Sequence, residues 1–235
     1  MRETRQVFVT GGTGYLGNAL LPALLARGHR VRALARPGSE AKLPLGCGAV
    51  PGNALDAVTF AGRVAPADTL VHLVGVSHPA PWKAEQFRTV ELASARASVE
   101  AAREAGVRHF VYLSVAQPAP AMRAYVAARA EVEALIAGSG LNATFVRPWY
   151  VLGPGHRWPY ALIPMYALLE RLPTTRDTAR RLGLVTLRQM VDTLVWAVES
   201  PAEGVRVMDV EAIRKTGFGS ASVSAAGPLG GSLVS

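Results

Sequence analysis

The chain has 235 residues, half of them hydrophobic, which suits one α/β domain with a large core. Its single cysteine, Cys47, excludes an internal disulfide and a cysteine-based metal cluster and fits a reducing compartment. The net charge of +8 comes from scattered arginines without interleaved aromatic residues, which favours a solvated basic surface over nucleic-acid binding. No signal segment and no stretch long enough for a membrane span is recognisable, so we expect a cytoplasmic protein without stable membrane insertion.

The first predicted element is a strand at residues 6–10, which leads through a glycine-rich turn into a helix at residues 18–27. This order is typical of a pyrophosphate-binding turn. Gly11 allows the tight turn, Gly14 lets the backbone approach the phosphates, and Gly17 permits close packing of helix on strand. The helix N-terminus then attracts the anion. The predicted cofactor-binding residues of the turn are Gly11, Thr13, Gly14, Tyr15, Leu16 and Gly17.

Short apolar runs then alternate with helical patterns, which indicates a parallel sheet covered on both faces by crossover helices. The sequence therefore predicts an α/β fold, a Rossmann-type doubly wound parallel sheet with its ligand at the carboxyl ends of the strands. The predicted strands are residues 30–35, 49–50, 69–73, 109–114 and 143–147, and the predicted helices are residues 54–63, 83–105 and 122–137.

The texture changes after Arg147. We expect a turn-rich loop at residues 148–157, an apolar helix at 160–169 kinked at Pro164, a helix at 187–199 and a closing strand at 204–210. Residues 216–235 carry no charge and consist largely of Gly, Ser and Ala, which favours a disordered tail. The predicted organisation is one domain, 1–215, with a small carboxy-terminal substrate-side appendage from about 148–203.

Several motifs occur in an order that resembles the short-chain dehydrogenase/reductase superfamily, in its extended-to-atypical branch. The similarity extends from residue 6 to about residue 214 and is greatest to compact NAD(P)H-binding proteins that resemble nucleoside-diphosphate-sugar epimerases or nitrogen-metabolite-repression regulators. The motifs are Thr10-Gly11-Gly-Thr-Gly14-Tyr-Leu-Gly17, Gly106-Val-Arg-His-Phe-Val-Tyr-Leu-Ser114, Tyr125 with a cation four residues on, Arg147-Pro148 and Leu152-Gly-Pro-Gly155.

The end of the second strand predicts the choice of cofactor. A carboxylate there accepts hydrogen bonds from a free 2′-hydroxyl and repels a 2′-phosphate, whereas this strand ends at Arg36, which can bind phosphate. We therefore expect NADP rather than NAD, with Ser39 as a second phosphate donor. The alternative is that Arg36 only meets water at the strand end. Asn53, after the third strand, occupies the place where the resemblance implies a side chain beside the adenine, although an acid is more usual there.

The resemblance also implies a catalytic group of serine, tyrosine and lysine. Here Ser114 would polarise a substrate carbonyl, and Tyr125 would exchange the proton at the substrate oxygen. The lysine is replaced by Arg129, which keeps the charge and can bind the nicotinamide ribose but cannot release a proton. Either Arg129 substitutes electrostatically, lowering the Tyr125 pKa, or the site is a relic.

Other side chains leave further alternatives open. His72, within the fourth strand, fits a packed core histidine, whereas His78 and His156 lie in predicted loops near the cleft and are candidate proton donors. No residue spacing suggests a metal. Four aromatic residues either line an apolar pocket or pack a loop against the sheet: Trp149, Tyr150, Trp158 and Tyr160.

Three functions follow from these observations. The first is an NADP-dependent oxidoreductase or epimerase-like enzyme acting on a small carbonyl or alcohol compound. The alternative is a non-catalytic NADP(H)-sensing or assembly protein, which Arg129 and the short carboxy-terminal region favour. A third role, at a membrane surface or with a quinone-like ligand, rests on the apolar segment 160–169. The resemblance suggests a homodimer through the helices at 83–105 and 122–137.

Overall fold

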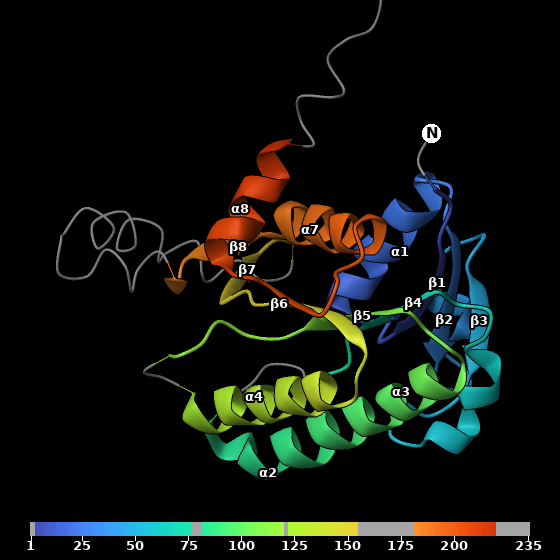
Figure 1. The fold of residues 1–235 in the computed structure, drawn as a ribbon, viewed down its shortest axis with the longest axis horizontal. Helices are drawn as coiled ribbons and strands as arrows, with labels where there is room; N and C mark the ends of the chain where they lie inside the picture. Colours follow the sequence, from blue (N-terminus) through green and yellow to red (C-terminus); the bar gives the residue numbers. More distant parts are fainter. Residues whose placement is uncertain (1–2, 77–80, 120–121, 155–180, 220–235) are drawn as a thin grey trace, which may run out of the picture.

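The computed structural model describes residues 3–76, 81–119, 122–154 and 181–219. These residues form a seven-stranded parallel sheet with helices on both faces and a separate two-stranded sheet (Figure 1). The strands of the large sheet are β1 (Gln6–Thr10), β2 (Arg30–Ala35), β3 (Gly48–Pro51), β4 (Thr69–His72), β5 (His109–Leu113), β6 (Asn142–Val146) and β9 (Val205–Met208). The small sheet pairs β7 (Tyr150–Leu152) with β8 (Leu184–Thr186).

The strand order in the large sheet is β3-β2-β1-β4-β5-β6-β9, and all neighbours are parallel. The chain builds outward from β1 to β3 and then crosses back to place β4 on the other side of β1. Doubly wound sheets bind ligands at this reversal, beside the carboxyl ends of the strands. Thr10 and His72 are register partners there. The predicted Rossmann-type doubly wound α/β fold is confirmed.

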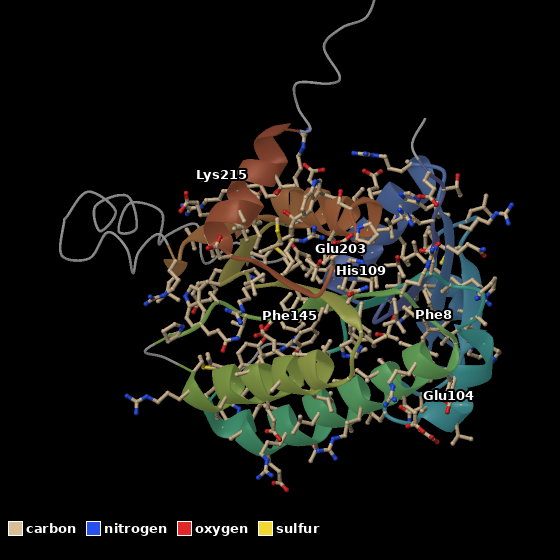
Figure 2. The ribbon with its side chains drawn as sticks, viewed as in Figure 1. Phe8, Glu104, His109, Phe145, Glu203 and Lys215 are labelled. Atoms are coloured by element: carbon tan, nitrogen blue, oxygen red, sulfur yellow. The ribbon has the colours of Figure 1, made fainter. Side chains whose placement is uncertain are left out.

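Two helical layers cover the sheet (Figure 1). The long helices are α1 (Tyr15–Ala26), α3 (Ala93–Glu104), α4 (Arg123–Gly138), α7 (Leu187–Glu199) and α8 (Val210–Gly219). Short helical segments are η1 (Glu40–Lys42), η2 (Ala57–Thr59), η3 (Ala61–Arg63), η4 (Pro81–Lys83), α2 (Ala84–Gln86) and the π-helix η5 (Phe87–Leu92). Strand alternation sends Val7 and Val9 into the core beneath α1 and α7, and Phe8 with Phe145 into the core beneath α3 and α4 (Figure 2).

The predicted helix at residues 54–63 is wrong. The segment instead forms the two short 3₁₀ helices η2 and η3. Its polar side chains bind nearby backbone: the Asp56 carboxylate accepts from the Val58 N–H at 3.1 Å, and the Thr59 hydroxyl donates to the Asp56 carbonyl at 2.7 Å. Such local bonds compete with helical ones, which explains why the segment turns instead of continuing as a helix.

The carboxy-terminal part departs from the prediction in two places. The expected turn-rich loop at residues 148–157 contains strand β7, and helix α8 ends at Gly219, four residues into the expected tail. The predicted helix at 187–199 is confirmed as α7, and β9 lies within the predicted closing strand. The apolar helix expected at 160–169 and the rest of the tail lie outside the described residues. Within the described ranges, every helix is too short or too polar to cross a bilayer.

His72 connects the carboxyl ends of β1 and β4, where the strand order reverses, to helix α3. Its side chain is fully buried in β4, and Nδ1 lies 2.8 Å from the Thr10 hydroxyl and 3.0 Å from that of Ser98, while Nε2 lies 3.4 Å from the Ser94 hydroxyl. The prediction of a packed, hydrogen-bonded core histidine is confirmed. Burial, helped by the charge of Arg129, lowers the pKa of His72 to about 3.

This lowered pKa predicts a stability loss at mildly acid pH. The unfolded chain protonates His72 near its ordinary value of about 6.5, whereas the folded protein keeps it neutral, so acid favours unfolding between these values. Between these two pKa values, the protonation of His72 alone should lower the free energy of unfolding by about 1.4 kcal/mol for each unit by which the pH falls. Urea unfolding of the wild type and of His72→Gln at about pH 7 and about pH 5 measures it.

Comparison with His72→Gln cancels the contribution of every other titrating group to the pH dependence, because both proteins contain those groups. From about pH 7 to about pH 5 the wild type should lose about 2 kcal/mol more than His72→Gln. Parallel losses in the two proteins would show that His72 titrates normally in the folded state.

Candidate active site

The glycine turn after β1 has the geometry that a bound pyrophosphate requires. Gly11 has a φ of +77°, and a Cβ there would lie 2.8 Å from the Leu73 carbonyl carbon. A Cβ on Gly17 would lie 2.3 Å from the Gly12 carbonyl oxygen, so helix α1 packs directly on the turn. Gly14 is exposed at the N-cap of α1, where a Cβ would meet only the Gly11 oxygen, at 3.2 Å. The turn is therefore held in place by the close backbone contacts of Gly11 and Gly17, and it is open at Gly14, in front of the N-terminus of α1.

The other residues predicted in the turn face different surroundings. Thr13 is half-buried, and Leu16 packs against the core beneath α1. The Tyr15 hydroxyl reaches the segment after β7, because a Cβ on Gly153 would lie only 2.2 Å from it. The Tyr15 side chain thus connects the turn to the carboxy-terminal part of the domain.

Arg36 and Asn53 lie at the carboxyl ends of β2 and β3. Arg36 is exposed, and its guanidinium makes no hydrogen bond or ion pair with the described residues. The side-chain oxygen of Asn53 accepts a hydrogen bond from the Leu55 N–H at 3.1 Å, and the backbone N–H of Asn53 donates to the Thr59 hydroxyl at 2.9 Å. Asn53 therefore shapes the turn after β3, while Arg36 is available to a ligand.

Ser114 and Tyr125 lie beyond the carboxyl end of β5. Ser114 follows β5 and is 3% exposed, and its Oγ has no hydrogen-bond partner among the described residues. Tyr125 lies in the first turn of α4 and is half-buried, with its ring centroid 5.1 Å from that of Phe87. An unpaired buried hydroxyl is costly unless a ligand or water supplies its partner.

Arg129 lies one helical turn after Tyr125, as the spacing predicts, and is buried with 3% exposure. Its guanidinium carbon lies 5.3 Å from the centre of the Tyr125 ring. Nη1 donates to the Tyr112 hydroxyl at 3.3 Å and to the Leu113 carbonyl. Instead of projecting freely toward a ligand, the guanidinium is held by the protein.

The partner that sequence reasoning missed is Glu91. It is 1% exposed, and its Oε2 lies 3.0 Å from Arg129 Nε while its Oε1 accepts from Nη2 at 3.2 Å. The Val76 N–H also donates to Oε1, at 3.0 Å. One signal was present in the sequence: Glu91 falls four residues after Phe87, on the face of the predicted helix that carries its apolar residues.

Burial dominates the protonation of this cluster. It raises the pKa of Tyr125 above its ordinary value, and the Arg129 guanidinium opposes part of that rise. Arg129 does lower the Tyr125 pKa through its charge, as expected, but the loss of solvation is the larger effect, so the net pKa lies above the ordinary value. Burial likewise raises the pKa of Glu91, opposed by the Arg129 charge and the Val76 N–H.

A second polar network lies beside the site. Arg147 Nε donates to the Glu133 carboxylate at 2.9 Å, and the Gln117 amide donates to its other oxygen at 3.0 Å. The network joins the segments after β5 and β6 to α4. Next to it is a hollow of about 450 Å³ lined in part by Arg123 and Val126.

The remaining candidates are placed only in part. His78, His156, Trp158 and Tyr160 lie outside the described residues. The rings of Trp149 and Tyr150 lie 5.5 Å apart, edge to face, and Trp149 also packs against the core. In the part of the chain that the structure describes, no group of three His, Cys, Asp or Glu side chains is arranged for a metal ion.

A model of the NAD(P)H-binding family matches residues 11–162, well over half of the chain. The matched part includes the glycine turn, Ser114, Tyr125 and Arg129. The chain belongs to this NAD(P)H-binding family. A nicotinamide dinucleotide is therefore its cofactor class.

Two bacterial reductases are similar to this chain over most of its length. Ceramide reductase of Caulobacter vibrioides is 29% identical over 215 residues, which cover 90% of this chain and 66% of that protein. The 3-diazoavenalumate denitrifying reductase of a Streptomyces species is 31% identical over 226 residues, covering 85% of this chain and 74% of that protein. Among solved structures, the Bordetella bronchiseptica enzyme WbmH in complex with NAD+ superposes with a TM-score of 0.66 at 21% identity, covering 97% of this chain and 85% of that one.

Proposed function

We propose that the protein is an NADP-dependent reductase, with epimerase-like architecture, that acts on a small carbonyl or alcohol compound. The observation that carries the proposal is the buried Ser114 hydroxyl, which lacks a partner among the described residues and follows directly on the carboxyl end of β5. A substrate carbonyl oxygen would accept from this hydroxyl. The open face of the glycine turn and the exposed Arg36 guanidinium fit a bound dinucleotide phosphate.

In the proposed reaction Tyr125 supplies the proton. When bound, the nicotinamide cofactor supplies the hydride equivalent. The Ser114 hydroxyl orients and polarises the carbonyl, and the Tyr125 phenol donates its proton to the oxygen as negative charge develops there. The phenol is protonated at neutral pH, as a proton donor to a substrate oxygen must be. The reductase names of the two similar proteins support reduction as the direction.

The alternative is a protein that senses or carries NADP(H) without catalysis. The hydrogen bonds of Arg129 support it, because Nη1 and Nη2 both donate to protein groups and Nε faces the Glu91 carboxylate, which leaves little of the guanidinium for a ribose. The Ser114 hydroxyl, which has no partner among the described residues, supports the enzyme, since a substrate oxygen would supply that partner. Cytoplasmic location, dimerisation through α3 and α4, and one domain over 1–215 stay predictions.

The catalytic assignment predicts that Tyr125→Phe abolishes turnover. Removing the proton donor should lower kcat by about 10²- to 10⁴-fold while NADPH still binds, because the hydroxyl is the only group lost. Loss of NADPH absorbance across a panel of ketones, aldehydes, quinones and sugar nucleotides measures turnover, and fluorescence titration measures binding. In the wild type, reduction should be independent of pH near neutrality and fall only at alkaline pH, as the phenol ionises.

Two outcomes would contradict this assignment. Full turnover by Tyr125→Phe would remove Tyr125 from the reaction. Tight NADPH binding without turnover of any panel member by the wild type would favour the sensing protein.

The cofactor assignment predicts that Arg36→Ala weakens NADPH much more than NADH. Losing a charge-assisted bond to the 2′-phosphate should cost about 2 kcal/mol, or about thirtyfold in Kd. Arg30→Ala is the matched control, because Arg30 is an exposed arginine at the opposite end of the same strand. Calorimetric Kd values for both cofactors test it, and an equal loss for both would point to NAD.

A further inference from the structure

The structure assigns Glu91 the role of a positioning residue for the proposed active site. Its carboxylate holds the Arg129 guanidinium against the Tyr125 ring and at the same time fixes the segment that follows β4. This inference rests on the proposed function, because it gives Glu91 a role in the reactivity of Tyr125.

The contacts of Glu91 make this role specific. Oε1 accepts from two elements, the Arg129 side chain of α4 and the Val76 N–H after β4, and Oε2 lies 3.0 Å from Arg129 Nε. Oε1 has two lone pairs for the two hydrogen bonds, and the charge of the carboxylate adds the ion pair with Arg129, which an uncharged side chain cannot provide. Glu91 therefore connects three segments at the Tyr125 site: its own helix η5, helix α4 and the segment after β4.

The backbone around Glu91 and Arg129 is adapted to this pair. Glu91 lies in the π-helix η5, a rare form that often occurs at functional sites. Gly75 leaves room for the guanidinium, since a Cβ there would lie 2.2 Å from Arg129 Nη2 and 3.1 Å from Glu91 Oε1. An ordinary surface ion pair requires neither feature.

Charge compensation explains why the pair matters to Tyr125. A buried guanidinium needs a counter-charge, and removing one member of a buried pair leaves the other uncompensated. The ionisable groups that face Tyr125 in the described residues are Arg129 from its own helix, Glu91 from η5 and Tyr112 from β5. The negative charge of Glu91 raises the pKa of Tyr125, and the positive charge of Arg129 lowers it.

The test is Glu91→Gln, which keeps the size of the side chain and removes its charge. Without Glu91 the Arg129 charge acts on Tyr125 alone, so the Tyr125 pKa should move to lower pH. Phenolate absorbance, taken as the difference between each protein and its Tyr125→Phe counterpart, measures that pKa without a substrate. The alkaline limb of the kcat profile should shift in the same direction, and kcat should fall about tenfold while KM changes little.

The controls separate positioning from a merely structural role. Glu100→Gln removes an exposed carboxylate from helix α3, beyond the contacts of Arg129, and should leave the Tyr125 pKa and kcat unchanged. If Glu91→Gln does not fold, Glu91→Asp keeps the charge but shortens its reach, and the same absorbance difference should again show a displaced Tyr125 pKa. A folded Glu91 variant with an unshifted Tyr125 pKa would overturn the inference.

The two proposals can fail separately. If no panel compound is reduced, the proposed function fails, but the phenolate titration still decides whether Glu91 controls Tyr125. If turnover depends on Tyr125 and its pKa is insensitive to Glu91, the inference fails alone.

Discussion

The burial of one positive charge constrains the whole carboxyl edge of this domain. Arg129 lies where the resemblance implies a lysine, and its longer, planar side chain reaches across to the segment after β4. A charge in that position must be compensated, and Glu91 supplies the negative partner from the neighbouring helix. Gly75 then has to lack a side chain. The replacement of lysine by arginine is thus accompanied by fitting residues in two other segments, Glu91 in η5 and Gly75 after β4.

Two further interactions hold this edge of the sheet in place. The Thr10–His72 bond holds together the carboxyl ends of β1 and β4, on either side of the reversal in strand order. The contact of Gly17 with the turn fixes the start of α1. Gly14 at the front of the glycine turn is exposed, and the Ser114 hydroxyl has no protein partner in the described chain. The rigid parts of the domain therefore surround the place where a cofactor and a carbonyl compound would meet.

The sequence predicted what local signals determine. The glycine turn, strand Arg30–Ala35 and helix Leu187–Glu199 depend on residues close in the chain; Thr186 and Gln189, for instance, form a capping box at the start of that helix. It did not predict what distant pairing determines. The three-residue strand β7 exists because it pairs with β8, more than thirty residues later. The ion pair of Glu91 with Arg129 spans 38 residues, so spacing within one helix could reveal Arg129 but not its partner. The net pKa shift of Tyr125 likewise required its burial in three dimensions.

A crystal structure with NADPH bound tests the central claim most directly, namely that Glu91 holds Arg129 while Ser114 and Tyr125 serve the reaction. The account predicts that the Glu91–Arg129 pair stays intact and that the nicotinamide ring faces the Ser114 and Tyr125 hydroxyls across space for a small carbonyl compound. Departure of Arg129 from Glu91 to bind the ribose, or a nicotinamide ring turned away from both hydroxyls, would contradict it.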